Sequence, residues 1–423
     1  MQPITRTRQL RRSVSAAWRE LSSSAVQSSS GPLQGYTVLD LGQVVAGNFC
    51  GALLGYFGAD VIKVEPPQNG DPLRHLRDLD STGTSLWWRT YGRNRQCLTA
   101  DLRKEEGRDL IRRLAQSGSV DVILENFRPG VMEKWGLGPA DLPEHIIFSR
   151  ISGYGQTGPK AKFPGYASVC EAESGFRSLN GFPDRPSVRP NISLGDSLAG
   201  MHAAFGVVMS LLERQKSGRG QVVDAAITES MFNMLEGVLP EYIASGKTKV
   251  RSMSGSSISQ VVPSGVWRSK DDHYVVIGAN GNSVYDRLVT AIGRPDMKAD
   301  SAPRFASDAT RVEAEDEIND VIERYVSSHD ADEVIKTMED ARVPAGMIMT
   351  IEDIYNDEHW RARGMWEEIE GTVVPTMVPK LSRTPGKTTS LGRPLGADTE
   401  EILKMRLGMS DDKIAELRRN GIV

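Results

Sequence analysis

The fold is decided between residues 38 and 65, where the sequence reads VLDL (38–41), then GNFCGALLGYFG (47–58), then VIKVE (61–65). The first and last of these runs are typical of short buried strands. Gly47, Gly51 and Gly55 recur every four residues and therefore share one face of a helix. Because glycine is unfavourable in a helix, that face must pack closely against the sheet. The stretch predicts a βαβ unit, which favours a parallel sheet with right-handed crossovers.

The alternation of strands and helices continues along the chain. Helical stretches such as 104–116 and 197–214 lie between the later strands. Those strands are expected at 96–102, 120–125, 146–151 and 221–225. The pattern predicts an α/β fold with a doubly wound, Rossmann-like parallel sheet in the large domain. No Gly-x-Gly-x-x-Gly follows the first strand, which disfavours a nicotinamide-dependent enzyme.

The second half of the chain has a different pattern. Polar sequence rich in Ser and Gly around 247–260 is typical of a linker. Beyond it, 265–268 and 274–278 predict a hairpin. Helices are expected at 283–292, 313–326 and 332–341. These elements predict a smaller α+β domain.

Composition restricts the classes of partner. The net charge is −4 and no basic block follows residue 30, so nucleic-acid binding is not expected. No uninterrupted apolar stretch approaches the ~18–20 residues of a membrane span, so membrane insertion is not expected either. Cys50, Cys97 and Cys170 are far apart and odd in number, which argues against a disulfide framework. Neither the cysteines nor the histidines have the spacing of metal ligands, and we expect no metal site.

The first 30 residues differ from the rest of the chain. They contain five arginines and eight serines against a single acidic residue, Glu20. An Arg- and Ser-rich, acid-poor start with an amphipathic stretch is typical of a mitochondrial transit peptide. We therefore expect residues 1–30 to direct the protein to the mitochondrial matrix. The alternative is a disordered basic tail.

Asp196 is the carboxylate placed most like a nucleophile. It lies in SLGDSLAG (193–200), directly before the apolar run Met201–Leu212. At a helix start, free N–H groups and the helix dipole stabilise the charge of an Asp side chain. The flanking glycines leave room for a bulky group to approach. The alternative is that Asp196 only caps the helix.

Several motifs accompany Asp196 in a fixed order. They are the glycine-rich βαβ start, ENFRPG (125–130), SGYG (152–155), KSGRGQ (216–221) and LGRPLG (391–396). In this order the motifs resemble those of the class III CoA-transferases, the family of formyl-CoA transferase and carnitine CoA-transferase. The resemblance runs from about Leu33 to Gly396.

The resemblance implies a covalent mechanism with Asp196 as the catalytic residue. Its carboxylate attacks a donor acyl-CoA to give a mixed anhydride, which the released thiolate converts to an aspartyl-CoA thioester. The acceptor acid then reverses these steps. CoA thioesters are substrates in this scheme, and no tightly bound cofactor is implied.

The resemblance also implies which residues bind CoA. They are Val44, Val45, Ala46, Asn126, Phe127, Tyr166, Lys134 and Arg95. For Lys134 and Arg95 the alternative is a solvated surface charge. Relatives carry an Arg after the second strand where this chain has Pro66, so that contact is lost or supplied by Arg74 or Arg103.

Tyr166 separates two branches of the superfamily. Racemases of branched acyl-CoA carry a His there as a base, and a tyrosine with a pKa near ~10 is a poor replacement. A transferase is therefore favoured over a 2-methylacyl-CoA racemase or epimerase. A catalytically inactive CoA-binding scaffold is disfavoured because Asp196 and its glycines are present.

The segment 165–190 resembles the branch that uses small dicarboxylates of the itaconate, malate, citramalate or mesaconate type, with succinyl-CoA as donor. Arg189 is the candidate for binding a distal carboxylate, since a guanidinium can bind one bidentately. The alternative is a loop arginine that binds main chain.

The resemblance completes the expected organisation, with a large domain built from both chain ends and two interlocked subunits in a homodimer. The predicted parts are 1–30 as transit peptide, 31–230 as the large CoA-binding domain, 231–260 as linker, 261–349 as the small domain, and 350–423 returning to the large domain.

Overall fold

The computed structural model describes residues 31–423. Two compact units divide them. The first contains the chain up to Ser174, Pro190–Met234 and Gly364–Val423, and the second contains Gly175–Arg189 and Leu235–Arg363. Each unit has its own hydrophobic core.

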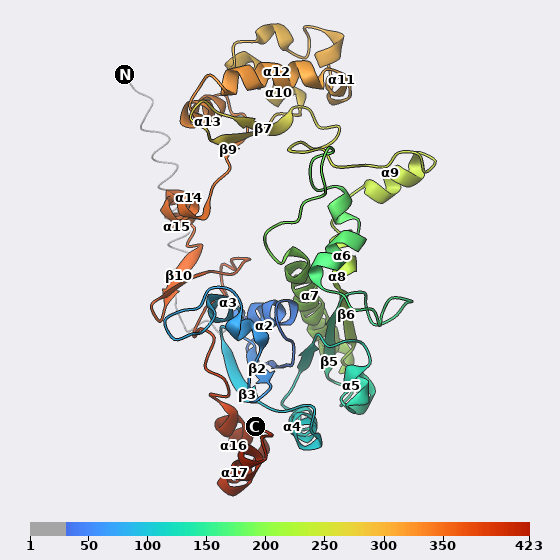
Figure 1. The fold of residues 1–423 in the computed structure, drawn as a ribbon, viewed down its shortest axis with the longest axis vertical. Helices are drawn as coiled ribbons and strands as arrows, with labels where there is room; N and C mark the ends of the chain where they lie inside the picture. Colours follow the sequence, from blue (N-terminus) through green and yellow to red (C-terminus); the bar gives the residue numbers. More distant parts are fainter. Residues whose placement is uncertain (1–30) are drawn as a thin grey trace. The chain divides into compact units, whose positions relative to one another are not determined.

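A six-stranded sheet in the order β3-β2-β1-β4-β5-β6 forms the centre of the first unit (Figure 1). Every neighbouring pair is parallel. The strands are β1 Thr37–Asp40, β2 Asp60–Glu65, β3 Arg95–Thr99, β4 Val122–Glu125, β5 Ile147–Ser152 and β6 Val222–Ala226. The predicted α/β class with a doubly wound parallel sheet is confirmed. The strand order reverses between β1 and β4, and ligands of such sheets bind at that point, beyond the carboxyl ends of the strands.

Helices cover both faces of this sheet. Successive strand residues alternate between two cores: Val38 packs in one, and Leu39 packs in the other. The helices of the first unit are α2 Ala46–Tyr56, α3 Leu86–Tyr91, α4 Glu105–Gln116, α5 Val131–Lys134, α6 Ala167–Glu173, α7 Leu194–Ser217, α8 Ile227–Phe232, α16 Thr399–Leu407 and α17 Asp411–Arg419. The hairpin β10 Trp366–Ile369 and β11 Thr372–Pro375 belongs to the same unit.

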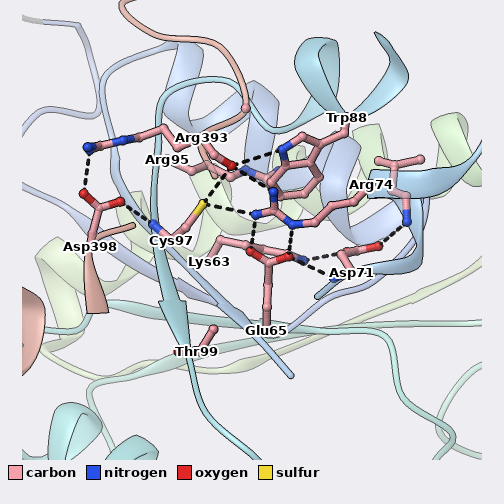
Figure 2. Close-up of polar contacts among 12 residues, drawn as sticks. Lys63, Glu65, Asp71, Arg74, Trp88, Arg95, Cys97, Thr99, Arg393 and Asp398 are labelled. Atoms are coloured by element: carbon pink, nitrogen blue, oxygen red, sulfur yellow. Dashed lines mark hydrogen bonds and ion pairs between the residues drawn. The ribbon is translucent and has the colours of Figure 1, made fainter. Parts of the chain in front are cut away.

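The C-terminal segment packs against α4 and β3 within this unit. Ile402, Leu403 and Ile414 lie in the same core as Leu110 of α4. Polar contacts strengthen the association, since the N–H of Cys97 donates to Asp398 Oδ2 at 2.7 Å (Figure 2). Residues about 300 positions apart therefore form one core.

The glycine stripe of α2 has the predicted close contacts. A Cβ at Gly47 would lie 2.8 Å from Gly42 Cα, and one at Gly51 would lie 2.6 Å from Asp40 Oδ2. A larger side chain at either position would displace the loop after β1 or the side chain of Asp40. The stripe thus fits the helix against the end of β1.

The long helix α7 packs on α2, β5 and β6, with Ala199, Ala203 and Val207 fully buried. Among residues 31–423, α7 is the one helix long and apolar enough to cross a membrane by length and composition. The earlier criterion, an uninterrupted apolar run, did not detect it. Core helices have the same character, and 44% of its most apolar window is buried in the protein.

The second unit contains the antiparallel sheet β7-β8-β9, with β7 Ser264–Arg268, β8 Tyr274–Gly278 and β9 Ala345–Met347. Its helices are α9 Val238–Ala244, α10 Asn282–Ala291, α11 Asp308–Glu313, α12 Glu315–Val326, α13 Ala331–Asp340, α14 Ile351–Asn356 and α15 Glu358–Ala362. The hairpin β7–β8 has the predicted strands. The helix expected over 313–326 is α12, which begins two residues later, at Glu315, and α11 before it was not predicted.

Candidate functional site

A cavity of about 350 Å³ opens at the carboxyl edge of the sheet in the first unit. The segments after β1, β4 and β5 line it together with the first turn of α7. Seven predicted site residues meet there: Val44, Val45, Ala46, Asn126, Phe127, Tyr166 and Asp196. Segments more than 150 residues apart therefore form a single concave site at the point where the strand order reverses.

Asp196 is the third residue of α7 and is half-buried. The helix begins three residues earlier than expected and its N-cap is Ser193, so Asp196 lies in the first turn and not at the N-cap position. A carboxylate in the first turn still interacts favourably with the helix dipole. The charge of Asp196 contributes, after burial, to raising the pKa of the neighbouring Cys170 thiol to about 11. This thiol stays protonated at neutral pH, which leaves Asp196 as the nucleophile candidate of the pair.

Gly195 fixes the position of Asp196. Its N–H donates to the buried Glu171 Oε1 at 3.1 Å. A Cβ on Gly195 would lie 3.0 Å from Ile227 Cγ2 and 3.2 Å from Glu171 Cγ. A side chain at this position would therefore press on α6 and α8, and their side chains would have to shift by a few tenths of an ångström.

Asn126 holds the loop that follows β1. Its Oδ1 accepts from the N–H of Gln43 at 2.7 Å, and its Nδ2 donates to the carbonyl of Gln43 at 2.8 Å. Both ends of the amide are therefore bound to main chain. This geometry makes Asn126 a residue that shapes the cavity as well as one that lines it.

Phe127 is oriented by its own main chain and by a ring contact. Its N–H donates to Glu125 Oε2 at 2.7 Å, and its ring meets Trp135 edge-on with centroids 5.1 Å apart. Burial raises the pKa of Glu125 to about 7, although Arg150 Nε lies 2.7 Å from Oε1 and opposes the shift. The main-chain hydrogen bond to Glu125 and the ring contact with Trp135 hold Phe127 at the boundary between two cavities.

A second cavity, of about 370 Å³, adjoins the first through Gln43 and Phe127, which line both. It extends over the ends of β2 and β3 and includes Pro66 and Arg103. The Arg103 side chain is 74% exposed, and its Nε lies 2.8 Å from Asp101 Oδ1.

Arg74 is the other candidate to replace the arginine that relatives carry at the position of Pro66, but its guanidinium binds Glu65. Its Nε and Nη2 donate to the two carboxylate oxygens of Glu65 at 2.7 and 2.6 Å (Figure 2). Its guanidinium also stacks 3.9 Å above the Trp88 ring. Of the two arginines, only Arg103 lines the second cavity.

Three predicted site residues lie outside both cavities. Arg95 is buried, and its Nη1 lies 3.0 Å from Asp40 Oδ2 and 2.5 Å from Asn48 Oδ1. It is therefore neither at a ligand surface nor a solvated charge. Lys134 is exposed at the end of α5, and Arg189 is exposed in the second unit. The residues of 31–423 contain no cluster of three or more His, Cys, Asp or Glu side chains suited to a metal.

Sequence reasoning missed a layer of buried polar side chains beneath the first cavity, among them Asn48, Lys63 and Asp71. One signal was available: a lysine inside the apolar strand 61–65 is rarely buried unless it is paired. The partner could not be identified, because Asp71 lies in a polar turn outside the strand pattern.

Known proteins resemble this chain over most of its length. The model of "CoA-transferase family III" matches residues 33–399. The chain is 41% identical to succinyl-CoA–D-citramalate CoA-transferase of Chloroflexus aurantiacus, over 93% of this chain and 98% of the relative. It is 38% identical to the succinyl-CoA–L-malate CoA-transferase alpha subunit of that organism, over 93% and 92%. A CAIB/BAIF family protein from Brucella suis has a similar structure, with a TM-score of 0.78, 29% identity, and coverage of 89% of this chain and 100% of that one.

Proposed function

Since the chain belongs to CoA-transferase family III and is therefore a CoA-transferase, we propose that it moves CoA from succinyl-CoA to a small dicarboxylic acid through Asp196. The observation that carries the proposal is the cavity in which Asp196 faces the loop after β1 and the segment after β4. The named relatives use succinyl-CoA with citramalate or malate. These relationships favour the transferase over the racemase.

The chemistry follows from a carboxylate placed beside a thioester. An Asp196 oxygen attacks the thioester carbon, the C–S bond breaks, and CoA leaves as the thiolate with succinyl-aspartyl anhydride formed. The thiolate then attacks the aspartyl carbonyl, which gives aspartyl-CoA and free succinate. The acceptor carboxylate repeats both steps in reverse. Main-chain N–H groups at the start of α2 are suited to stabilise the oxyanions, because the first turn of a helix leaves its N–H groups without helical partners.

The two adjoining cavities bind different parts of the CoA molecule in this proposal. The thioester end belongs in the cavity of Asp196, and the nucleotide end belongs in the second cavity, where Arg103 supplies a positive charge. Phe127 lies between them and contacts the connecting part.

Trapping of the intermediate tests this function. Enzyme incubated with succinyl-CoA and no acceptor, then quenched with hydroxylamine, should give a hydroxamate on the peptide that contains Asp196. The Asp196→Asn variant is the matched control and should give none. Unmodified Asp196 together with solvent deuterium at the α-carbon of the acyl group would establish the racemase instead.

The oligomer we propose is a homodimer, supported by an apolar stripe on α7. Met201, Phe205, Met209 and Leu212 are between 45 and 64% exposed and recur at helical spacing. A second copy of the chain is the occupant we assign to it. Light scattering should give twice the chain mass, and Phe205→Glu should reduce it. A monomeric wild-type protein, or one recovered only with membranes, would refute the assignment.

For residues 1–30, which lie outside the described part of the chain, we propose mitochondrial targeting, supported by their Arg- and Ser-rich, acid-poor composition. The matrix is then the location of the enzyme. A fluorescent reporter fused to residues 1–30 should enter mitochondria. A reporter that stays diffuse would refute this proposal and leave the others intact.

A further inference from the structure

In the loop between β1 and α2, side chains bind the main chain of Gly42 and Gln43. The N–H of Gly42 donates to Asp40 Oδ1 at 2.9 Å, and its carbonyl accepts from the buried Lys63 ammonium. The N–H and carbonyl of Gln43 are both bound by the Asn126 amide. Side chains therefore take all four polar main-chain groups of these residues.

Val44 continues the pattern and adds strain. Its N–H donates to Asp71 Oδ1 at 3.0 Å, and its carbonyl accepts from Asn48 Nδ2 at 2.7 Å. Its φ is +59°, which is an outlier for a β-branched residue. Such a conformation persists only where the surroundings over-determine it. Val44 also lines the cavity of Asp196, so the strain lies at the candidate site.

A fully buried ionic layer supports the two side chains that hold Val44. Lys63 Nζ lies 3.0 Å from Asp71 Oδ2 (Figure 2). Asn48 Nδ2 donates to the same oxygen at 2.7 Å. None of these three side chains can reorient toward water, because each residue is buried. The contacts to Val44 are thus fixed from below by charge pairing.

We infer that Asp71, supported by Lys63 and Asn48, is a positioning residue that holds Val44 in its left-handed conformation and so shapes the CoA cavity. The inference rests on the proposed function for the identity of the ligand. The inference also separates Val44 from the residues that follow it, because the N–H and the carbonyl of Val44 are both hydrogen-bonded within the protein. Ligand contacts with main chain are then left to Val45 and Ala46, where α2 begins.

The identity of residue 44 makes the inference testable. We call the two hydrogen bonds that Val44 makes with Asp71 and Asn48 the clamp. Glycine adopts positive φ about as readily as negative φ, so residue 44 needs no clamp in a Val44→Gly variant. If Asp71 acts by holding Val44, its loss should matter much less in the Val44→Gly background. If Asp71 serves only general stability, its loss should cost the same in both backgrounds.

The experiment compares wild type, Asp71→Ala, Asp71→Asn, Val44→Gly and the Asp71→Ala/Val44→Gly double variant. In Asp71→Ala, hydrogen exchange in peptides covering residues 41–50 should accelerate about tenfold, and the KM for succinyl-CoA should rise by a similar factor. Asp71→Asn retains an oxygen for the Val44 N–H and should restore part of both. In the Val44→Gly background the change caused by Asp71→Ala should fall to about twofold or less.

Arg93→Met is the matched control. Arg93 is equally buried and bonds the Pro375 carbonyl at 2.9 Å, but it does not touch the loop. The Arg93→Met variant should have a lower melting temperature, but hydrogen exchange at residues 41–50 and the KM for succinyl-CoA should stay as in wild type. If Asp71→Ala does not fold, Asp71→Asn with and without Val44→Gly carries the same comparison.

Two results would overturn the inference: unchanged exchange at 41–50 in the Asp71 variants, or equal effects in the two backgrounds. Exchange needs no substrate, so it decides the clamp even if the proposed function fails. Failure of that function would instead be seen as absence of any acyl transfer by the wild type. Calorimetric titration with CoA itself would then replace the KM.

Discussion

Lys63 in the first unit and Arg311 in the second are both fully buried cations, and their surroundings use them differently. In the first unit Lys63 neutralises the buried Asp71, whose other oxygen holds the strained Val44 beside a cavity. In the second unit Arg311 donates to the carbonyls of Val262 and Phe305 at 3.1 and 3.0 Å.

The surroundings of Arg311 explain the difference. Its guanidinium stacks 4.6 Å from the Tyr285 ring, inside a core of apolar side chains. Its acidic partner, Asp308, is 55% exposed, so only one of the two charges is buried. Burial of a charge does not by itself indicate function. The main-chain groups that the charge holds, and what those groups line, distinguish the two cases.

The largest expected effect removes the chemistry and leaves both cation networks intact. Asp196→Asn should lower the transfer rate at least ~10³-fold, because the neutral amide cannot form the anhydride. Unfolding free energy should change by no more than ~1 kcal/mol, since the amide has the same shape as the carboxylate and loses the interaction of its charge with the helix dipole. Steady-state kinetics and chemical denaturation measure the two quantities. Turnover by Asp196→Asn at nearly the wild-type rate would mean that another residue is the nucleophile.

Breaking the second unit's network should cost stability instead. Arg311→Met leaves the Val262 and Phe305 carbonyls buried without their donor, at ~1–3 kcal/mol for each such group. Calorimetry should show earlier unfolding of this unit. Hydrogen exchange at residues 41–50 should stay as in wild type. Faster exchange there would mean that the two networks are coupled and the comparison fails.

Much of this organisation could be predicted from local patterns. Each of the six strands of the sheet begins within two residues of the predicted first residue. The prediction succeeds because buried parallel strands are nearly continuous apolar runs. The strand β9 could not be predicted, since three residues, Ala345–Met347, carry no periodicity. The family resemblance, which is confirmed, supplied the cavity residues that pattern alone would not assemble.

The clamp on Val44 could not be predicted. Val44 and Asp71 are 27 positions apart, and Asn126 reaches the loop across 83. Neither spacing repeats in the sequence, and both contacts depend on which strands are neighbours. The burial of Arg95 has the same origin, since β3 is placed by its pairing with β2.

A pH titration sharpens the comparison through Asp71. Burial acts to raise the pKa of Asp71, but Lys63 and hydrogen bonds from Leu73, Asn48 and Val44 outweigh it, so the pKa is lowered from 3.8. A lowered carboxyl pKa stabilises the fold above the unfolded value and loses that contribution as pH falls through the folded one. Wild type should therefore exceed Asp71→Asn in unfolding free energy by a constant margin from pH 8 to 5. The margin should narrow below about pH 4.

The matching measurement is denaturation of both proteins across this pH range. Arg311→Met, which removes a cation whose acidic partner is exposed, should show no comparable narrowing. A margin between wild type and Asp71→Asn that is independent of pH down to 3 would mean that the charge of Asp71 does not support the loop.

The smallest effect concerns the exposed charges near the cavities. Arg103→Gln should raise the KM for succinyl-CoA by no more than a few-fold, because water largely screens the charge of the 74% exposed guanidinium. The effect should shrink as salt increases, and the melting temperature should not change. Lys134→Gln is the matched control, an exposed cation on α5 outside both cavity linings. If Lys134→Gln raises the KM more than Arg103→Gln does, the nucleotide lies over α5, as the family resemblance implies, and the second cavity does not hold it.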